Sequence, residues 1–352
     1  MNFQELLYKI KNSFEANLPF VVYSKPNKKQ VQGIFQNNNQ LHYLKNYKEK
    51  GFVFAPFDNR EKIVLFPLDK SDIHSVKASN EYQFIENKIS IIKTDLSKLE
   101  HVDLVTKGIQ FIKDKKAEKV VLSRKEEVQS DGFSITKTFS NILSSYNNAF
   151  VYVWYHPKIG LWLGATPETL ISVENNQFKT VALAGTQTYK GSLDVKWQSK
   201  EIEEQQIVTN YIFSQINTKI ENLKTSKPYT VKAGDLMHLK TDISGTLKKH
   251  NDLQILVENM HPTPAVCGMP KEIAKEFILD NENYNREYYT GFLGELNLKN
   301  NSHLFVNLRC MKIINNIASI YIGGGITKDS VAEKEWQETV EKCKVMKKVL
   351  VN

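Results

Sequence analysis

Four short apolar segments follow one another closely in the middle of the chain and constrain its fold more than any other feature of the sequence. They lie at 150–155, 161–164, 170–173 and 178–183. Only short turns separate them. Antiparallel strands can be joined by such turns, whereas parallel strands need a crossover of a dozen or more residues. We therefore predict an antiparallel sheet in this region.

The rest of the sequence mixes strand and helix patterns without strict alternation. Residues 1–95 carry short apolar runs between polar turns, which predicts small strands. Further strands are expected at 120–122, 304–311 and 318–322. Apolar residues at helical spacing predict helices at 104–112, 135–146, 197–223 and 332–350. In the helix at 197–223, the residues expected to face inward are Ile207, Tyr211, Ile216, Ile220 and Leu223. This order indicates an α+β fold.

The composition indicates a globular protein. Hydrophobic residues make up 41% of the 352 positions and charged residues 24%, which is enough apolar material for a core. No apolar run approaches the roughly 18–20 residues that cross a bilayer. The three cysteines, Cys267, Cys310 and Cys343, are far apart and form no CxxC pair, so we expect neither a disulfide framework nor a zinc site. We expect a cytoplasmic protein without a membrane anchor.

The chain carries a formal net charge of +8. A lysine-rich solvated surface explains this charge, and so does a field that attracts a small acidic substrate. The basic residues are scattered and accompany no nucleic-acid-binding motif. We therefore expect no nucleic-acid partner, although a non-catalytic basic binding protein is kept as an alternative from another functional class.

Two pairs of glutamates recur at helical spacing. Glu201 and Glu204 are three residues apart in one predicted helix, as are Glu335 and Glu338 in the last one. Residues at i and i+3 share a helix face. Carboxylates that crowd together need a proton or a cation, and Mg²⁺ accepts carboxylate oxygens. From the spacing alone, two ordinary solvated helix faces explain the pattern better.

Eight motifs occur in a fixed order and change that interpretation. They are Lys119-Val-Val-Leu-Ser-Arg124, Gly164-Ala-Thr-Pro-Glu168, Ala182-Leu-Ala-Gly-Thr186, His261-Pro-Thr-Pro-Ala265, Arg286-Glu-Tyr-Tyr-Thr-Gly291, Asn307-Leu-Arg309, Gly323-Gly-Gly-Ile326 and Glu335-Trp-Gln-Glu-Thr339. In this order they resemble the chorismate-binding enzyme family, which includes isochorismate, salicylate, anthranilate and aminodeoxychorismate synthases. The resemblance assigns 95–350 to the catalytic region and 1–94 to a variable N-terminal part of the same fold. It implies two large, mostly antiparallel β-sheets packed together and flanked by helices, with the active site in a deep cleft.

The resemblance also implies a reaction. Water attacks C2 of chorismate and the C4 hydroxyl leaves, so the site needs a base and an acid. Lys119 matches the family's base, a role open to lysine only where burial lowers its pKa. Glu168 matches the acid, which must hold its proton near neutral pH in an enclosed site. Without the resemblance, both residues would be interpreted as ordinary charged groups at a strand start and in a turn.

The cofactor implied by the resemblance is Mg²⁺. Glu204 and Glu338 match its two main ligands, and Glu201 and Glu335 match supporting carboxylates that act through metal-bound water. Many relatives have histidine after the residue that matches Glu204, whereas this chain has Gln205. This difference leaves the ligand itself intact and puts a contact behind it in doubt.

The remaining site residues implied by the resemblance contact the substrate. Arg309 and Lys342 match cations that bind its carboxylates, and we expect Arg309 on an alternating strand that fixes its direction. The backbone amides of Gly323 and Gly325 are expected to donate further hydrogen bonds to an anion. Residues that line the cleft correspond to Gly185, Thr186, His238 and Tyr289. For His238, a structural role fits nearly as well.

The choice among the family's reactions depends on two positions. The amine-forming siblings generally lack a lysine at the position of Lys119, which favours water as the nucleophile. Ala184 stands where aminodeoxychorismate synthases often carry a catalytic lysine. Salicylate synthase, which eliminates pyruvate after forming isochorismate, is the main alternative, although Pro264-Ala265-Val266 looks more like the isochorismate enzymes. We expect a monomer that acts on chorismate, and we expect its product to serve menaquinone biosynthesis rather than a siderophore, a choice that the sequence alone leaves open.

Overall fold

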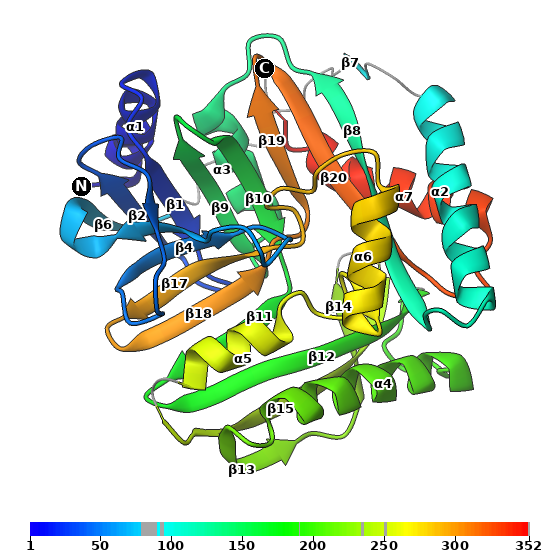
Figure 1. The fold of residues 1–352 in the computed structure, drawn as a ribbon. Coiled ribbons are helices and arrows are strands. Elements are labelled where there is room, and N and C mark those ends of the chain that lie inside the picture. Colours follow the sequence, from blue (N-terminus) through cyan, green and yellow to red (C-terminus); the bar gives the residue numbers. More distant parts are fainter. Residues whose placement is uncertain (79–89, 92–94, 190, 234–235, 250–251, 351–352) are drawn as a thin grey trace.

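In the part of the chain that the structure describes, two ten-stranded antiparallel β-sheets pack face to face and carry helices on their outer surfaces (Figure 1). The computed structural model describes residues 1–78, 90–91, 95–189, 191–233, 236–249 and 252–350. Every strand pairing in the described residues is antiparallel. The predicted α+β architecture of two large sheets is confirmed.

The first sheet contains the strand that carries Lys119. Its order is β16 (Gly268–Met269), β8 (Lys119–Gln129), β20 (Ile317–Ile326), β19 (Cys310–Ile314), β10 (Gly160–Thr166), β9 (Phe150–His156), β1 (Phe20–Ser24), β2 (Gln30–Gln36) and β6 (Ser71–Lys77), and β7 (Ser90–Ile91) also pairs with β8. The helices α1 (Phe3–Glu15), α3 (Ile135–Ser145) and α7 (Ala332–Lys347) pack against this sheet in one hydrophobic cluster.

The second sheet packs against the helix that carries Glu201. Its order is β13 (Ile220–Thr225), β15 (Leu236–Leu247), β12 (Gln177–Thr188), β11 (Thr169–Glu174), β18 (Asn301–Val306), β17 (Phe292–Leu298), β4 (Gly51–Ala55), β5 (Val64–Pro67) and β3 (His42–Tyr43), with β14 (Tyr229–Ala233) pairing with β15. The helices α4 (Ser199–Ile216) and α5 (Asp252–Met260) cover it. A third group, α2 (Asp95–Lys113) and α6 (Lys271–Asn281), packs around β8, and a short 3₁₀ helix, Leu68–Lys70, precedes β6.

The N-terminal residues complete both sheets. β1, β2 and β6 belong to the first sheet, and β3, β4 and β5 belong to the second. The helix α1 begins at a capping box in which Asn2 Oδ1 accepts from the Glu5 amide and Glu5 Oε2 accepts from the Asn2 amide, which satisfies two amides at the helix start. The boundary between residues 94 and 95 stays a prediction.

Aromatic side chains fill the space between the sheets. Phe66 stacks on Trp154 with ring centroids 5.1 Å apart, and Phe54 lies 4.8 Å from the same Trp154 ring. Phe150 stacks on Phe305 of the opposite sheet at 4.3 Å. Burial of each such ring contributes roughly 1.5–3 kcal/mol to folding. This packed core holds the two sheets at a fixed separation.

The four central segments form strands as predicted, but they divide between the two sheets. β9 and β10 pair in the first sheet, and β11 and β12 pair in the second. The chain crosses from one sheet to the other at Pro167–Glu168, between β10 and β11. The prediction of one sheet through all four segments was therefore wrong, because strand spacing does not reveal a change of sheet.

Two further predictions are corrected by the structure. The helix expected at 197–223 ends at Ile216, and Ile220 begins β13, which pairs with β15. Among the described apolar residues of α4, Val208, Ile212 and Ile216 are buried, whereas Ile207 is 39% exposed. Pairing with a sheet edge outweighs the helical spacing of the last apolar residues.

The strand expected at 304–311 is in fact two strands in different sheets. β18 ends at Val306 in the second sheet, and β19 begins at Cys310 in the first. Arg309 lies in the crossover with a φ of 47°, so a left-handed turn fixes its direction and the pleat of a strand does not.

In the described part of the chain, Cys267, Cys310 and Cys343 are buried free thiols. No helix of this part has the length and apolarity to cross a membrane.

Candidate active site

Two crossovers between the sheets lie side by side and place an acid next to an arginine. The Ala165 amide donates to the Arg309 carbonyl at 3.1 Å, and the Val306 amide donates to the Glu168 carbonyl at 2.9 Å. Thr166 Oγ1 donates to the Val306 carbonyl at 2.6 Å and accepts from the Glu168 amide at 3.3 Å. Each crossover thus holds the other in place. Thr166 was not predicted as a site residue, although it directly precedes Pro167 and Glu168.

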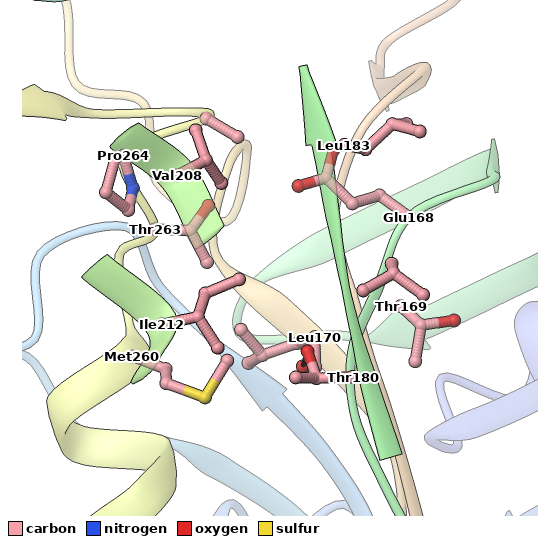
Figure 2. Close-up of a pocket in the computed structure, with 12 residues that line it drawn as sticks. Glu168, Thr169, Leu170, Thr180, Leu183, Val208, Ile212, Met260, Thr263 and Pro264 are labelled. Carbon is pink, nitrogen blue, oxygen red and sulfur yellow. Dashed lines mark hydrogen bonds between the residues drawn. The ribbon is translucent and has the colours of Figure 1, made fainter. Parts of the chain in front are cut away.

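Glu168 has the electrostatic character of an acid that keeps its proton. Burial raises the pKa of its carboxyl group to about 7, although Lys119 and Arg309 both act to lower it. Lys119 and Arg309 act on this carboxyl group as nearby charges. Figure 2 shows Glu168 across a small cavity from Thr263 and Pro264. The cavity measures about 20 Å³, which is enough room for one water molecule.

Lys119 lies at the start of β8, where the glycine-rich end of β20 passes beside it. A Cβ atom added at Gly325 would lie 2.8 Å from Lys119 Cε and 3.4 Å from its Nζ. Such a contact is too close for a side chain at that position. Glycine at position 325 therefore leaves room for the half-buried lysine. Since Lys119 lowers the pKa of Glu168, the predicted base and acid face the same region.

Arg309 places positive charge beside Glu168, and Lys342 places it at the glycine run of β20. Burial lowers the pKa of Arg309, and the neighbouring Glu168 acts to raise it. Lys342 Nζ donates to the Gly323 carbonyl at 3.0 Å and pairs with Glu338 Oε1 at 2.6 Å. The C-terminal helix α7 thereby presents a lysine to the glycine run of β20.

The glycine run also lies against Tyr289. A Cβ atom at Gly323 would approach the Tyr289 hydroxyl to 2.9 Å, so a larger residue would displace the tyrosine. Burial raises the pKa of Tyr289, which keeps its hydroxyl protonated, and Glu168 acts in the same direction. Gly324 points elsewhere, because a Cβ atom there would lie 3.5 Å from Glu335 Oε2.

His238 lies on β15 of the second sheet, within electrostatic reach of Lys342 and Glu338 on α7. Its Nδ1 lies 3.0 Å from the Gly185 carbonyl. Burial lowers the pKa of His238, the bond to Gly185 raises it, and Arg309 and Lys342 lower it further. Arg309 and Lys342 therefore lie close enough to influence it, and a neutral imidazole is favoured. Gly185 adopts a φ of 68° and lies beside Glu201, since a Cβ atom there would be 3.0 Å from Glu201 Cβ.

The predicted Mg²⁺ ligands are brought together only in part. Glu201 Oε2 accepts from the Gln198 amide at the start of α4, whereas Glu338 is paired with Lys342. The side chains of Glu204 and Thr186 lie outside the described residues. Among those that are described, no three histidine, cysteine or acidic side chains are gathered closely enough to hold a metal ion. The oxygen donors suit Mg²⁺ chemically.

Gln205 has a structural role in the helix α4. Its Nε2 atom donates to the Ala182 carbonyl at 3.0 Å and to Thr241 Oγ1 at 2.9 Å. The side chain is buried, with 1% of its surface exposed. Gln205 thus ties α4 to β12 and β15, and this bond orients the helix face that carries the glutamates.

Sequence comparison identifies the family. The profile of the chorismate-binding enzymes matches residues 57–351, which is most of the chain. This protein belongs to that family. Its relatives include the isochorismate synthase MenF of Escherichia coli (strain K12), 31% identical over 197 residues that cover 54% of this chain and 45% of the relative. The anthranilate synthase component 1 of Thermococcus kodakarensis is 25% identical over 295 residues, or 81% of this chain and 67% of that one.

Structural comparison gives the same fold. The solved structure of MenF, the menaquinone-specific isochorismate synthase from Escherichia coli, superimposes with a TM-score of 0.78 at 19% identity, covering 94% of this chain and 88% of that one. The sequence alignments to curated isochorismate synthases span only 45 to 65% of those relatives. Because the family also contains anthranilate synthases, membership alone leaves the nucleophile open.

Proposed function

We propose that this protein is an isochorismate synthase, an isomerase that adds water to C2 of chorismate and releases the C4 hydroxyl. The observation that carries the proposal is Glu168, a half-buried carboxyl group with a pKa of about 7 beside Lys119 and Arg309. An acid of this pKa is protonated in a useful fraction of molecules at neutral pH and can give its proton to a leaving hydroxyl. The named isochorismate synthases among its relatives agree with this reaction.

Lys119 is proposed to take a proton from the attacking water. As the oxygen forms its bond to C2, the ring double bond shifts and the C4–O bond breaks. Glu168 donates its proton to the departing hydroxyl, which leaves as water. One water enters and one leaves, so atoms and charge balance when Lys119 returns its proton to Glu168 through solvent. The reaction requires Lys119 to be neutral when it acts.

The cations at the site are proposed to hold the two carboxylates of chorismate. Arg309 is half-buried and presents a planar fork of donors that suits a carboxylate. Lys342 supplies a second charge beside the Gly323 carbonyl, and the amides of Gly323 and Gly325 are proposed as further donors. Since chorismate carries two negative charges, these contacts also oppose its escape.

We propose Mg²⁺ as the cofactor, held by Glu338 and Glu335 of α7 together with Glu201 and Glu204 of α4. The support is the donor chemistry of these carboxylates and their place on the two helices beside the site. When bound, the ion would supply a positive charge that neutralises the glutamates and holds a substrate carboxylate. Binding would also release Glu338 from its ion pair with Lys342, which frees the lysine for the substrate.

The product is proposed to serve menaquinone formation rather than a siderophore. The support is the similarity to Escherichia coli MenF. Expression in a strain that lacks its own menaquinone-specific isochorismate synthase tests this, because restored menaquinone is expected. Restored siderophore production without menaquinone would reassign the pathway.

Product analysis tests the reaction itself. The purified protein is incubated with chorismate, with and without Mg²⁺ and ammonium, and the products are separated by chromatography. Isochorismate formed only with Mg²⁺ is the expected result. Salicylate with pyruvate would assign the elimination as well, whereas an aminated product would remove the base role from Lys119. No turnover with any addition would contradict the proposed activity and favour a non-catalytic binding protein.

A further inference from the structure

Among the described residues, the strand that carries Lys119 has no strand neighbour along part of one edge. On one side, β20 pairs with β8 from Val120 to Gln129. On the other, β16 pairs only with Lys119 and Val120, and the Val121 amide donates to the Cys267 carbonyl just beyond it. In the described part of the chain, no strand continues this edge until β7 pairs at Val128.

A buried ion pair occupies the gap. Arg286 Nη2 donates to the Val121 carbonyl at 2.7 Å, and Glu282 Oε1 accepts from the Ser123 amide at 2.7 Å. The two side chains are 2% and 1% exposed and bind each other through two contacts, Nε to Oε2 at 2.7 Å and Nη2 to Oε1 at 2.5 Å. Together they offer β8 one donor and one acceptor, as a neighbouring strand would.

The same arginine reaches the segment that lines the cavity beside Glu168. Its Nη1 donates to the Val266 carbonyl at 3.0 Å and to Thr290 Oγ1 at 3.2 Å. Val266 follows Pro264 and Ala265, which line the cavity, and Thr290 follows Tyr289. One guanidinium group therefore fixes the base strand, the cavity segment and the tyrosine segment relative to one another.

We propose that the Glu282–Arg286 ion pair is a positioning device that sets the distance between Lys119 and Glu168. This inference rests on the proposed function for the roles of those two residues. A buried ion pair is rarely worth its desolvation cost for stability alone. Here it satisfies two backbone groups of an incomplete sheet edge and bridges three segments, which the planar fork of arginine permits and lysine does not.

Glu282→Gln and Arg286→Lys test the proposal, with Glu295→Gln as the matched control. Glu295 is also a buried carboxylate that accepts from a cation and a hydroxyl, Lys25 and Tyr23. Its partner Tyr23 lies on β1, which four strands separate from β8. We expect the first two variants to lower kcat by about 10–100-fold with little change in KM, because misplacement of the base affects the chemical step. The control is expected to keep kcat while losing a similar number of degrees in Tm.

A second measurement does not depend on the reaction. The rate at which acetic anhydride modifies Lys119, followed against pH by mass spectrometry in the absence of chorismate, reports the environment of its amine. We expect a shifted profile in Glu282→Gln and Arg286→Lys and an unchanged one in Glu295→Gln. If the wild type makes no isochorismate but the profiles shift, the proposed function fails and the positioning role stands. Unchanged profiles, or an equal loss of kcat in the control at equal Tm, would overturn the positioning role.

Discussion

Two glutamates in different parts of the sandwich are held in opposite ways. Glu295 accepts from the Tyr23 hydroxyl at 2.7 Å and from Lys25 Nζ at 2.9 Å, and its side chain is 4% exposed. Glu168 lies in a crossover between the sheets, where burial raises its pKa to about 7 against the opposing charges of Lys119 and Arg309. Hydrogen bonds from a cation and a hydroxyl favour the charged carboxylate of Glu295, whereas burial favours the protonated form of Glu168, whose proton can be transferred.

The same comparison explains why the charged groups of the site gather where they do. In a continuous antiparallel strand, every other side chain points into a packed layer. At the two crossovers, Pro167–Glu168 and Leu308–Arg309, the chain leaves one sheet for the other and the regular packing stops. Glu168 and Arg309 can approach each other there without displacing the aromatic core. The site thus depends on topology as much as on residue type.

Among the changes that test this comparison, removal of the proposed base is expected to lower catalysis the most. Lys119→Ala should lower kcat by about 10⁴-fold, near the upper limit for general base catalysis, while chorismate still binds. Isochorismate formation by chromatography and chorismate affinity by calorimetry measure the two parts. Lys113→Ala, at an exposed position at the end of α2, is the control and should behave as the wild type. Near-normal turnover by Lys119→Ala would assign the base to another group.

Removal of the acidic proton is the next largest effect. Glu168→Gln should lower kcat by about 10²–10³-fold, because the amide cannot donate to the leaving hydroxyl. In the wild type, kcat/KM should fall as pH rises through about 7, since the carboxyl group then loses the proton it must give. Glu168→Gln should lose this basic limb. If the limb persists in the variant, a group other than Glu168 is the acid.

The raised pKa of Glu168 should also make the stability of the folded protein decrease as pH rises. The pKa of Glu168 is raised in the folded state, so the folded protein binds the proton more tightly than the unfolded chain does. Its favourable contribution is complete below the unfolded pKa and is lost as pH rises through about 7. Thermal unfolding should therefore show that Glu168→Gln gains Tm relative to the wild type at alkaline pH and not at acidic pH. If the Tm difference between Glu168→Gln and the wild type were equal at acidic and alkaline pH, the carboxylate of Glu168 would be exposed to solvent.

A smaller change should move the base without removing it. In Gly325→Ala the added methyl group meets Lys119 Cε at 2.8 Å. Because this atom is near the end of a flexible side chain, the lysine can swing aside at little cost in stability. We expect kcat to fall by about 10-fold or more with Tm nearly unchanged. Gly324→Ala, whose Cβ atom meets Glu335 Oε2 at an ordinary 3.5 Å, is the control, and equal losses in both would exclude a specific effect on Lys119.

Much of the fold follows from local sequence, because apolar spacing and short turns report strands directly. The segments β9 to β12 and the helices α2, α3 and α7 lie where their patterns predict them. The points at which the chain passes from one sheet to the other have no such pattern in the sequence. The strand predicted through Arg309 was wrong because the residues from Leu304 to Met311 keep a strand-like pattern even though the chain changes sheet among them. The helix predicted through Ile220 was wrong because this segment pairs with β15 instead.

The candidate site shows the same limit. Lys119, Glu168 and Arg309 were identified from motifs, and the structure places Lys119 and Arg309 within electrostatic reach of Glu168. Neither Glu282 nor Thr166 was singled out, because their importance comes from backbone groups far away in sequence, such as the Ser123 amide and the Val306 carbonyl. Contacts of a side chain with a distant backbone leave no periodic pattern. Their detection needs coordinates.

The smallest effect on catalysis is expected at the opposite glutamate. Glu295→Gln removes the charge that pairs with Lys25 and weakens the bond from Tyr23, which keeps its second contact to Gln32 Oε1 at 2.8 Å. The free energy of unfolding should fall by about 1–2 kcal/mol, measured by urea denaturation, while kcat and the basic limb near pH 7 stay as in the wild type. A carboxylate fixed by direct partners would then contribute only to stability. A shift of the basic limb in this variant would show that the two glutamates are coupled through the aromatic core, and the contrast between them would not hold.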